Sequence, residues 1–199
     1  ETRRLKSLSG EAATLRELLQ KLNKARPRLD PRAQPRRKSS KSGESMAKTN
    51  TFVPPETVLG LPPGLTGAPI SGQRGKLPPP VVGRIIGRFG QMLSTGLTRK
   101  GMRLQTAPGA QVVAPYEGRV VYAGKFRGYG ELLIIEHGEG YHSLLSGLAR
   151  IDSTMGQWVV AGEPVGVMGR PDGRKPVLYV ELRRNGQPIN PLPWLAAHK

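Results

Sequence analysis

Short β-rich runs separated by Gly and Pro turns fill the second half of this 199-residue chain, and they limit its fold more than any other feature. The runs cover residues 112–114, 119–123, 131–136, 143–145, 158–160, 165–168 and 177–183. Turn sequences such as Pro108-Gly109 and Glu117-Gly118 lie between them. Because helical periodicity is nearly absent here, we predict an all-β sandwich or barrel from residue 76 onward.

The N-terminal residues 1–26 have a different pattern. Leucines and one alanine at positions 5, 8, 12, 15, 19 and 22 are spaced alternately by three and four, as in the seam of a heptad repeat. We favour the end of a longer coiled coil, and a surface helix packed on its own domain is the alternative. The chain opens on Glu1 inside this helix, so we expect a fragment of a longer protein. Pro27 ends the helix.

Residues 27–75 are predicted to be a basic linker rich in Pro, Gly and Ser. Arginines and lysines greatly outnumber acidic residues between positions 26 and 50, and no hydrophobic period is present. This stretch is expected to be a flexible, solvated spacer, with binding to an anionic surface as the alternative. Segment 51–66 has apolar residues but no core of its own. It is either a regulatory segment that folds back on the domain or an inert tether.

The formal net charge of +17 predicts attraction to polyanions, which include nucleic acid, anionic membranes and acidic wall polymers. Much of this charge lies in the linker, aromatic residues are few, and no nucleic-acid-binding motif is present. We therefore expect no nucleic-acid partner.

The chain has no cysteine, which excludes disulfides and thiolate metal sites. It also has no run of about 20 apolar residues, the length that crosses a membrane.

The order of the β-rich blocks is specific. The sequence Gly118-Arg-Val-Val-Tyr-Ala-Gly124 is followed by Gly128-Tyr-Gly130, Ile134-Ile-Glu-His-Gly138, Gly156-Gln-Trp-Val-Val-Ala-Gly162, Val165-Gly-Val-Met-Gly169 and Leu178-Tyr-Val-Glu-Leu-Arg183. Together these blocks resemble a lysostaphin-like (LytM) peptidoglycan endopeptidase domain over residues 76–196. The resemblance implies a mostly β fold, with an antiparallel sheet domain preceded by the coiled-coil helix and the flexible linker.

The zinc ligands of that family are replaced in this sequence. Active members use a His-x-x-x-Asp pair, a His-x-His and a further His, and they leave one zinc position for water. The corresponding positions here are Arg99, Arg103, Gly147, Val177 and Tyr179. Arginine has no free lone pair and stays charged, and valine and glycine offer no ligand atom. His137, His142 and His198 match none of these positions, so the resemblance implies a degenerate domain that is not an enzyme and holds no metal or cofactor.

Within the family, the chain is most similar to the EnvC-type murein hydrolase activators. The similarity lies in the coiled coil and linker, in residues 75–83, in Lys100-Gly-Met102 and in the Asn-Pro-Leu-Pro-Trp194 ending. It implies a periplasmic protein that switches on zinc-dependent N-acetylmuramoyl-L-alanine amidases, which split septal peptidoglycan during cell division. In that family the coiled coil couples to an ABC-transporter-like division complex. The Pro-rich segment 51–75 and the short coiled coil depart from the pattern, so this partner stays open.

A groove is expected to remain where the metal ligands are lost. The positions expected to line it are Lys100, Arg103, Tyr129, Leu145, Tyr179 and Arg183. Apolar and aromatic side chains flanked by cations suit an amphipathic, partly acidic helix of the amidase. The plainer interpretation is that the two tyrosines simply pack and that the Arg183 side chain is a solvated edge charge. The alternative function is a structural module that binds peptidoglycan or the envelope, and a residual hydrolase is less favoured.

Overall fold

The computed structural model describes residues 17, 65–171 and 173–196. The predicted coiled coil, residues 27–64 of the linker and most of segment 51–66 lie outside the described residues. The described elements are η1 (Ile70–Gln73), β1 (Gly83–Gly87), β2 (Met102–Thr106), β3 (Gln111–Val113), β4 (Gly118–Phe126), β5 (Gly130–Gly138), β6 (Tyr141–Ile151), β7 (Trp158–Val159), β8 (Pro164–Met168), β9 (Val177–Arg184), β10 (Gln187–Ile189) and η2 (Leu192–Trp194). Of the helices described, none has the length and apolar character needed to span a bilayer.

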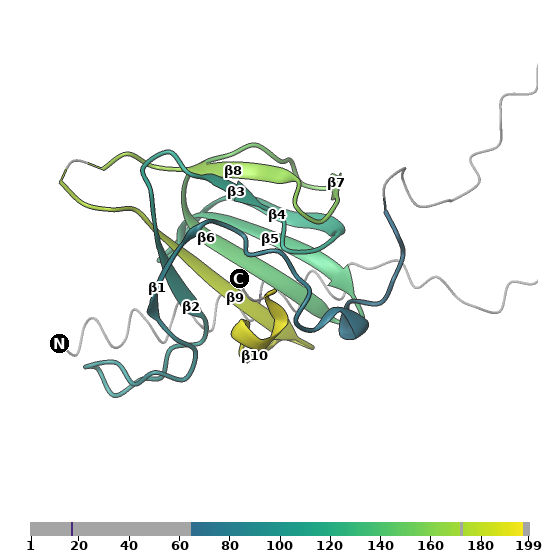
Figure 1. The fold of residues 1–199 in the computed structure, drawn as a ribbon, viewed down its shortest axis with the longest axis horizontal. Coiled ribbons are helices and arrows are strands. Elements are labelled where there is room, and N and C mark those ends of the chain that lie inside the picture. The colour runs from purple at the N-terminus through teal and green to yellow at the C-terminus, as the bar shows by residue number, and fades with distance from the viewer. Residues whose placement is uncertain (1–16, 18–64, 172, 197–199) are drawn as a thin grey trace, which may run out of the picture.

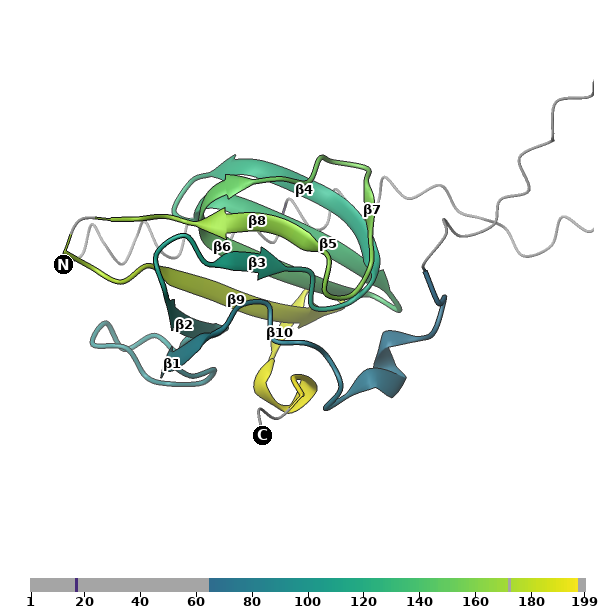
Figure 2. The same ribbon diagram turned by 45° about the horizontal axis from the view of Figure 1, so that its top comes forward.

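The strands form one antiparallel sheet in the order β1-β2-β9-β6-β5-β4-β7 (Figure 1). Strand β10 pairs with β9, and β8 pairs with both β3 and β6. Figure 2 shows β3 and β8 side by side in front of β5 and β6. The mostly β, antiparallel fold predicted from the sequence is therefore confirmed.

Each of the seven predicted β-rich runs overlaps a strand, whereas β1, β2 and β10 were not predicted. Strand β2 has the alternation of a half-buried strand, since Met102, Leu104 and Thr106 are buried and Arg103 is exposed. Strands β1 and β10 are short and contain Gly or Pro, which weakens their β signal.

Side-chain alternation divides the sheet into two faces with separate apolar clusters. Leu178 and Val180 of β9 and Leu145 of β6 pack in the main core beneath β3 and β8. The opposite face carries Leu144 of β6 with Leu132 and Ile134 of β5, packed against aromatic side chains of β4 and the following turn. The two faces are therefore chemically different, and the predicted site lies on the second one.

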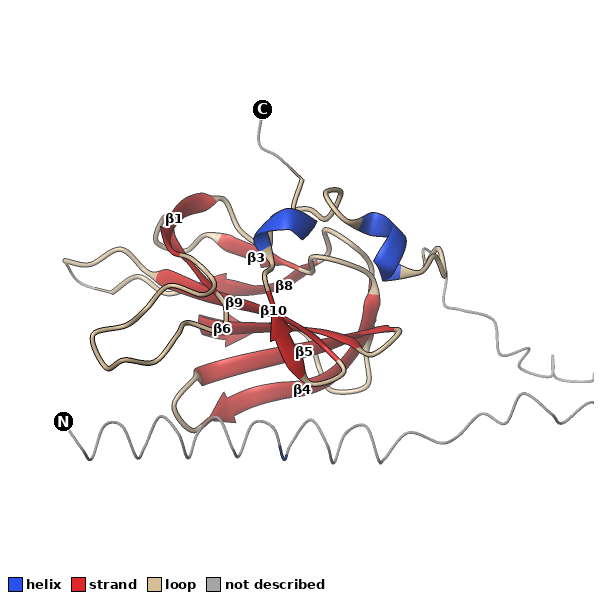
Figure 3. Ribbon diagram, turned by 90° about the horizontal axis from the view of Figure 1, so that it is seen from below, coloured by secondary structure: helices blue, strands red, loops and turns tan. Residues whose placement is uncertain are grey.

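A third cluster joins residues 65–77, here called the N-terminal arm, to the C-terminal end of the domain. Ile70 of η1 is fully buried and packs in one cluster with Trp194 of η2 and Tyr141. The amides of residues 75 and 77 both donate to the Trp194 carbonyl. Figure 3 shows the two short helices near each other, away from β4 and β5. The packed domain thus begins before residue 76, the predicted boundary, because an apolar anchor and main-chain bonds hold residues 65–75 against it.

Carboxylates of the domain also bind the N-terminal arm. Glu117 accepts hydrogen bonds from the amide of Thr66 at 2.7 Å, from its hydroxyl at 3.0 Å and from the amide of Gly67 at 2.8 Å. Glu139 accepts from the amide and the hydroxyl of Ser71, both at 3.0 Å. These bonds fix the place where the preceding segment joins the domain.

Candidate functional site

Strands β2, β9 and β6 bring the predicted metal-ligand positions together on the second face. Arg103 of β2 and Ser146 of β6 are the cross-strand partners of Tyr179 on its two sides. Gly147 lies against Val177, since a Cβ added at Gly147 would come within 2.5 Å of the Val177 carbonyl oxygen. Residues far apart in the sequence therefore lie next to one another on neighbouring strands.

Arg99 completes this group from the loop between β1 and β2. Its guanidinium lies over Gly87, where an added Cβ would be 3.0 Å from the Arg99 Cζ atom. Gly87 is in turn paired with Arg103. Arg99 and Arg103, two positions that the resemblance aligns with metal ligands, therefore both lie beside Gly87.

The side chains here are poorly suited to a divalent cation. No group of three or more His, Cys, Asp or Glu residues that could hold a metal ion occurs within the described ranges. The Nε atom of Arg99 is buried and lacks a hydrogen-bond partner among the described residues. Arginine side chains stay charged and offer no lone pair, so Arg99 and Arg103 would repel a cation and could not ligate it.

A buried hydrogen-bonded triad supports Tyr179 from within β9. Tyr179, Glu181 and Arg183 alternate along the strand and so lie on the same face. The tyrosine hydroxyl donates to Glu181 Oε2 at 2.6 Å, and Arg183 Nε donates to Glu181 Oε1 at 2.5 Å. The side chains of Glu181 and Arg183 are 0% and 3% exposed, so this ion pair is shielded from water. The triad holds the ring of Tyr179 in one orientation.

Burial and the neighbouring Glu181 carboxylate raise the pKa of Tyr179 far above its usual value near 10. Its hydroxyl is therefore protonated at neutral pH. Tyr179 therefore offers an aromatic ring and a neutral hydroxyl, not an anionic ligand for a metal.

A row of aromatic rings extends from the β4–β5 turn to Tyr179. Ring centroids are separated by 5.8 Å between Tyr122 and Phe126, by 5.9 Å between Phe126 and Tyr129, and by 6.1 Å between Tyr129 and Tyr179. Gly101 lies directly against the Tyr179 ring, where an added Cβ would be 2.8 Å from Cζ. The result is an aromatic surface edged by the cations of β2 and its preceding loop.

Four of the six predicted groove residues have exposed or partly exposed side chains, whereas the other two are buried. Lys100 is partly exposed, Arg103 is exposed, and Tyr129 and Tyr179 are in contact. Leu145 is fully buried in the main core on the opposite face, because alternation along β6 directs its neighbour Leu144 to the groove side.

Arg183 is the second correction, since it is a buried partner of Glu181 and not a solvated edge charge. Glu181 and Gly101 were not predicted as functional positions. The Tyr-x-Glu-x-Arg spacing of a strand was the available signal for Glu181, since it places opposite charges on one face. No sequence signal marked the close approach of Gly101 to the Tyr179 ring.

His137 has a structural role away from this surface. Its Nδ1 lies 2.8 Å from the main-chain oxygen of Glu117, and its Nε2 lies 2.8 Å from the Ser143 hydroxyl. Because a carbonyl oxygen only accepts, Nδ1 carries the hydrogen and Nε2 accepts from Ser143. Burial lowers the pKa of His137 to about 4. This side chain is a neutral histidine that joins β4, β5 and β6.

Comparison with known proteins shows what this domain is similar to. Residues 97–191 match the description "Peptidase family M23". Lysostaphin, solved by NMR, has a TM-score of 0.50 and 18% identity over 58% of this chain and 56% of its own, which supports the fold alone. The predicted lysostaphin-like fold is confirmed.

The similar curated proteins carry more specific names. Murein hydrolase activator EnvC of Escherichia coli (strain K12) is 37% identical over 155 residues, which are 76% of this chain and 36% of EnvC. Murein hydrolase activator NlpD of Salmonella dublin is 39% identical over 134 residues, which are 65% of this chain and 33% of NlpD. The chain thus spans about a third of the length of each. The resemblance to EnvC-type activators is confirmed.

Proposed function

We propose that this protein is a non-catalytic activator of periplasmic N-acetylmuramoyl-L-alanine amidases, acting in septal peptidoglycan splitting during cell division. One observation supports the proposal: Arg103, Tyr179 and Arg99, which the resemblance aligns with metal ligands, lie close together on neighbouring strands and the loop before β2, and none of them is a His or Asp. The names of the similar proteins support a role in regulating peptidoglycan hydrolysis. Since the amidase supplies the zinc in this scheme, this chain needs no metal of its own.

The surface suits an amphipathic helix with acidic residues along one side. The rings of Tyr129 and Tyr179 provide an apolar contact area, and Arg99, Lys100 and Arg103 provide positive charge at its edge. An amidase helix bound here would be withheld from its autoinhibitory position over the amidase zinc. The open amidase is then favoured by differential affinity, and a shift from 1:99 to 99:1 requires about 5.5 kcal/mol.

The test is release of dye from labelled sacculi by a purified zinc amidase, with and without this chain. Tyr179→Ala and Arg103→Glu are expected to reduce the stimulation at least tenfold, because they remove the aromatic contact and reverse an exposed edge charge. Arg74→Glu, which reverses an exposed cation after η1 in the N-terminal arm, is the matched control and is expected to stimulate normally. Circular dichroism checks that each variant is folded.

Two results would contradict the proposal. Full stimulation by both groove variants would exclude the groove as the amidase site. Dye release by this chain alone, in the presence of added zinc, would show a catalytic domain instead of an activator.

The net charge of +17 favours a second candidate, a structural module that holds peptidoglycan or another anionic envelope polymer. Co-sedimentation with purified sacculi separates the two functions. A wall-binding module sediments with sacculi and leaves every tested amidase unstimulated, whereas an activator stimulates at least one of them.

Segment 51–66 is proposed to act as a regulatory segment upon this groove. Deletion of residues 1–64 preserves the N-terminal arm that packs on the domain. The deletion is expected to raise amidase stimulation, and unchanged stimulation would make the segment an inert tether.

Coupling of the coiled coil to a division ABC-transporter-like complex is a further proposal, which a pull-down of the full chain with that complex tests.

A further inference from the structure

One end of the sheet is built from a stretch of chain without a single acidic residue. No Asp or Glu occurs between Glu56 and Glu117. This stretch forms β1, β2, β3 and the loop that joins β1 to β2. It carries exposed arginines, among them Arg84 and Arg88. This stretch of the described domain therefore carries positive charge and has no carboxylate of its own to balance it.

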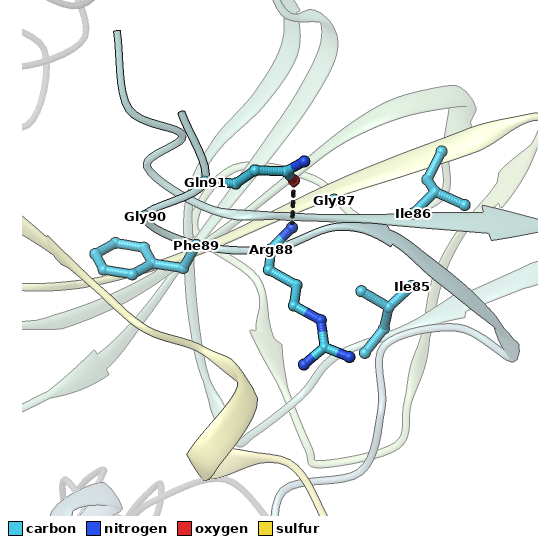
Figure 4. A pocket seen from close by; sticks show the side chains of 7 residues that line it. All are labelled: Ile85, Ile86, Gly87, Arg88, Phe89, Gly90 and Gln91. Carbon is cyan, nitrogen blue, oxygen red and sulfur yellow. Dashed lines mark hydrogen bonds between the residues drawn. The ribbon is translucent and has the colours of Figure 1, made fainter. Parts of the chain in front are cut away.

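A hollow of about 490 Å³ lies at this end, along the outer strand of the sheet. Its lining is Ile85, Ile86, Gly87, Arg88, Phe89, Gly90 and Gln91 (Figure 4). A smaller hollow of about 110 Å³ shares Ile85, Arg88 and Phe89 and reaches Asn190 and Leu192 near the C-terminal end. The two hollows share these three lining residues and are here together called the β1 recess, in which apolar side chains lie around a single arginine.

Arg88 is placed to meet an anionic group in the β1 recess. Figure 4 shows its side chain extending beside Ile85, while its amide donates to the Gln91 side-chain oxygen at 3.2 Å. No ion pair of Arg88 is found within the described residues. Its charge is therefore available to a ligand from outside the domain.

Strand β1 also ends the sheet. Among the described strands it pairs only with β2, so every second residue directs its N–H and C=O groups away from the sheet. The loop beside it is an ordered hairpin, because Gly90 donates to Arg99 at 2.8 Å and Leu93 donates to Leu97 at 2.8 Å. Near this edge, Ile86 is 39% exposed and Met92 is 73% exposed. An open backbone edge and an apolar, cationic recess are thus adjacent.

We propose that the β1 recess binds an extended, acidic peptide segment of a partner protein, which adds a strand to β1. The peptide backbone would pair with the open edge, an Asp or Glu would meet Arg88, and an apolar residue would lie against Ile85 and Phe89. Charge selects this occupant. A second copy of this chain would bring another +17, and residues 26–50 of the chain itself are strongly basic. The open N–H and C=O groups favour a peptide over a lipid or a polysaccharide, because a peptide backbone matches their spacing.

The test starts from random decapeptides displayed on phage and selected on the full chain, with counter-selection on Arg88→Glu. Enriched peptides are expected to combine acidic and apolar residues. By fluorescence anisotropy, a labelled enriched peptide should bind Arg88→Glu at least tenfold more weakly than the wild type and Arg127→Glu within twofold of it. A proline placed at the centre of the peptide should abolish binding, because strand addition needs its N–H groups. Amide chemical-shift changes should centre on residues 84–91.

Several results would overturn the proposal. These are the enrichment of peptides without acidic residues, equal loss of binding in the two charge variants, and shifts centred on Tyr179. Sedimentation with phosphatidylglycerol vesicles that depends on Arg88, without binding of any selected peptide, would assign the recess to anionic lipid instead. The recess adjoins the groove at Gly87, so the two sites are separated by a groove variant that lies outside the recess lining. Tyr179→Ala should bind the selected peptide like the wild type while failing to stimulate the amidase, so failure of this proposal and failure of the proposed function, on which it does not rest, are distinguishable.

Discussion

Acid should destabilise this domain through one buried side chain, His137. In the folded domain its Nδ1 donates to the Glu117 carbonyl and its Nε2 accepts from Ser143, so the ring is held neutral. Its pKa is about 4 when folded, against about 6.5 for an unperturbed histidine. Between these two values the unfolded chain binds a proton that the folded domain does not. The free energy of unfolding should therefore fall as the pH drops from about 6.5 to about 4.

The magnitude follows from the shift. One pKa unit corresponds to about 1.4 kcal/mol, so the full effect is about 3 kcal/mol and the part lost between pH 7.5 and pH 4.5 is about 2–3 kcal/mol. That is a large fraction of the 5–15 kcal/mol by which domains are typically stable. Urea unfolding followed by tryptophan fluorescence measures it at both pH values, since Trp194 is buried.

The comparison that isolates His137 is the difference between variants. His137→Gln should be less stable than the wild type at pH 7.5 and should lose about 2–3 kcal/mol less on acidification. His142→Gln retains His137 and should keep most of its contribution to the acid loss, because burial is the largest cause of the lowered pKa and the charge of His142 is a smaller one. If the wild type and His137→Gln lose the same free energy between the two pH values, the argument from burial is refuted.

Three further predictions concern the groove and the arm. Gly101→Ala should lower the free energy of urea unfolding by about 1–3 kcal/mol, because its Cβ would overlap the adjacent tyrosine ring, whereas Gly72→Ala, with no atom within 4 Å, should not. Glu181→Leu should lower the free energy of urea unfolding by about 3–5 kcal/mol, because it leaves the buried charge of Arg183 unpaired. The double variant with Arg183→Leu should recover part of that loss, and no recovery would contradict the role of the ion pair. Glu117→Ala should speed trypsin cleavage within the N-terminal arm by releasing three hydrogen bonds, and an unchanged rate would mean that the apolar anchor alone holds it.

Successive side chains of a strand point to opposite faces of the sheet, and the sequence did not show which face each residue of β6 takes. The site was therefore only partly predicted. The sequence around β6 reads Ser143-Leu-Leu-Ser146, where either leucine fits a buried strand position. Only pairing with β9 decides that Leu144 lies opposite Glu181 and that Leu145 lies opposite Val180. A shift of one residue in register would have exchanged the two.

The sequence by itself determined the class of fold, and through the resemblance it predicted that the metal ligands are replaced. Strand-length runs, turn residues and the order of the blocks are local properties, and the absence of a ligand atom from an arginine or a valine needs no coordinates. Only the tertiary structure decided that Arg183 is a buried partner of Glu181, that residues 65–75 pack on the domain, and that β1 forms an open edge beside a recess. These properties depend on contacts between residues distant in the chain, and neither spacing nor composition encodes how those residues pair.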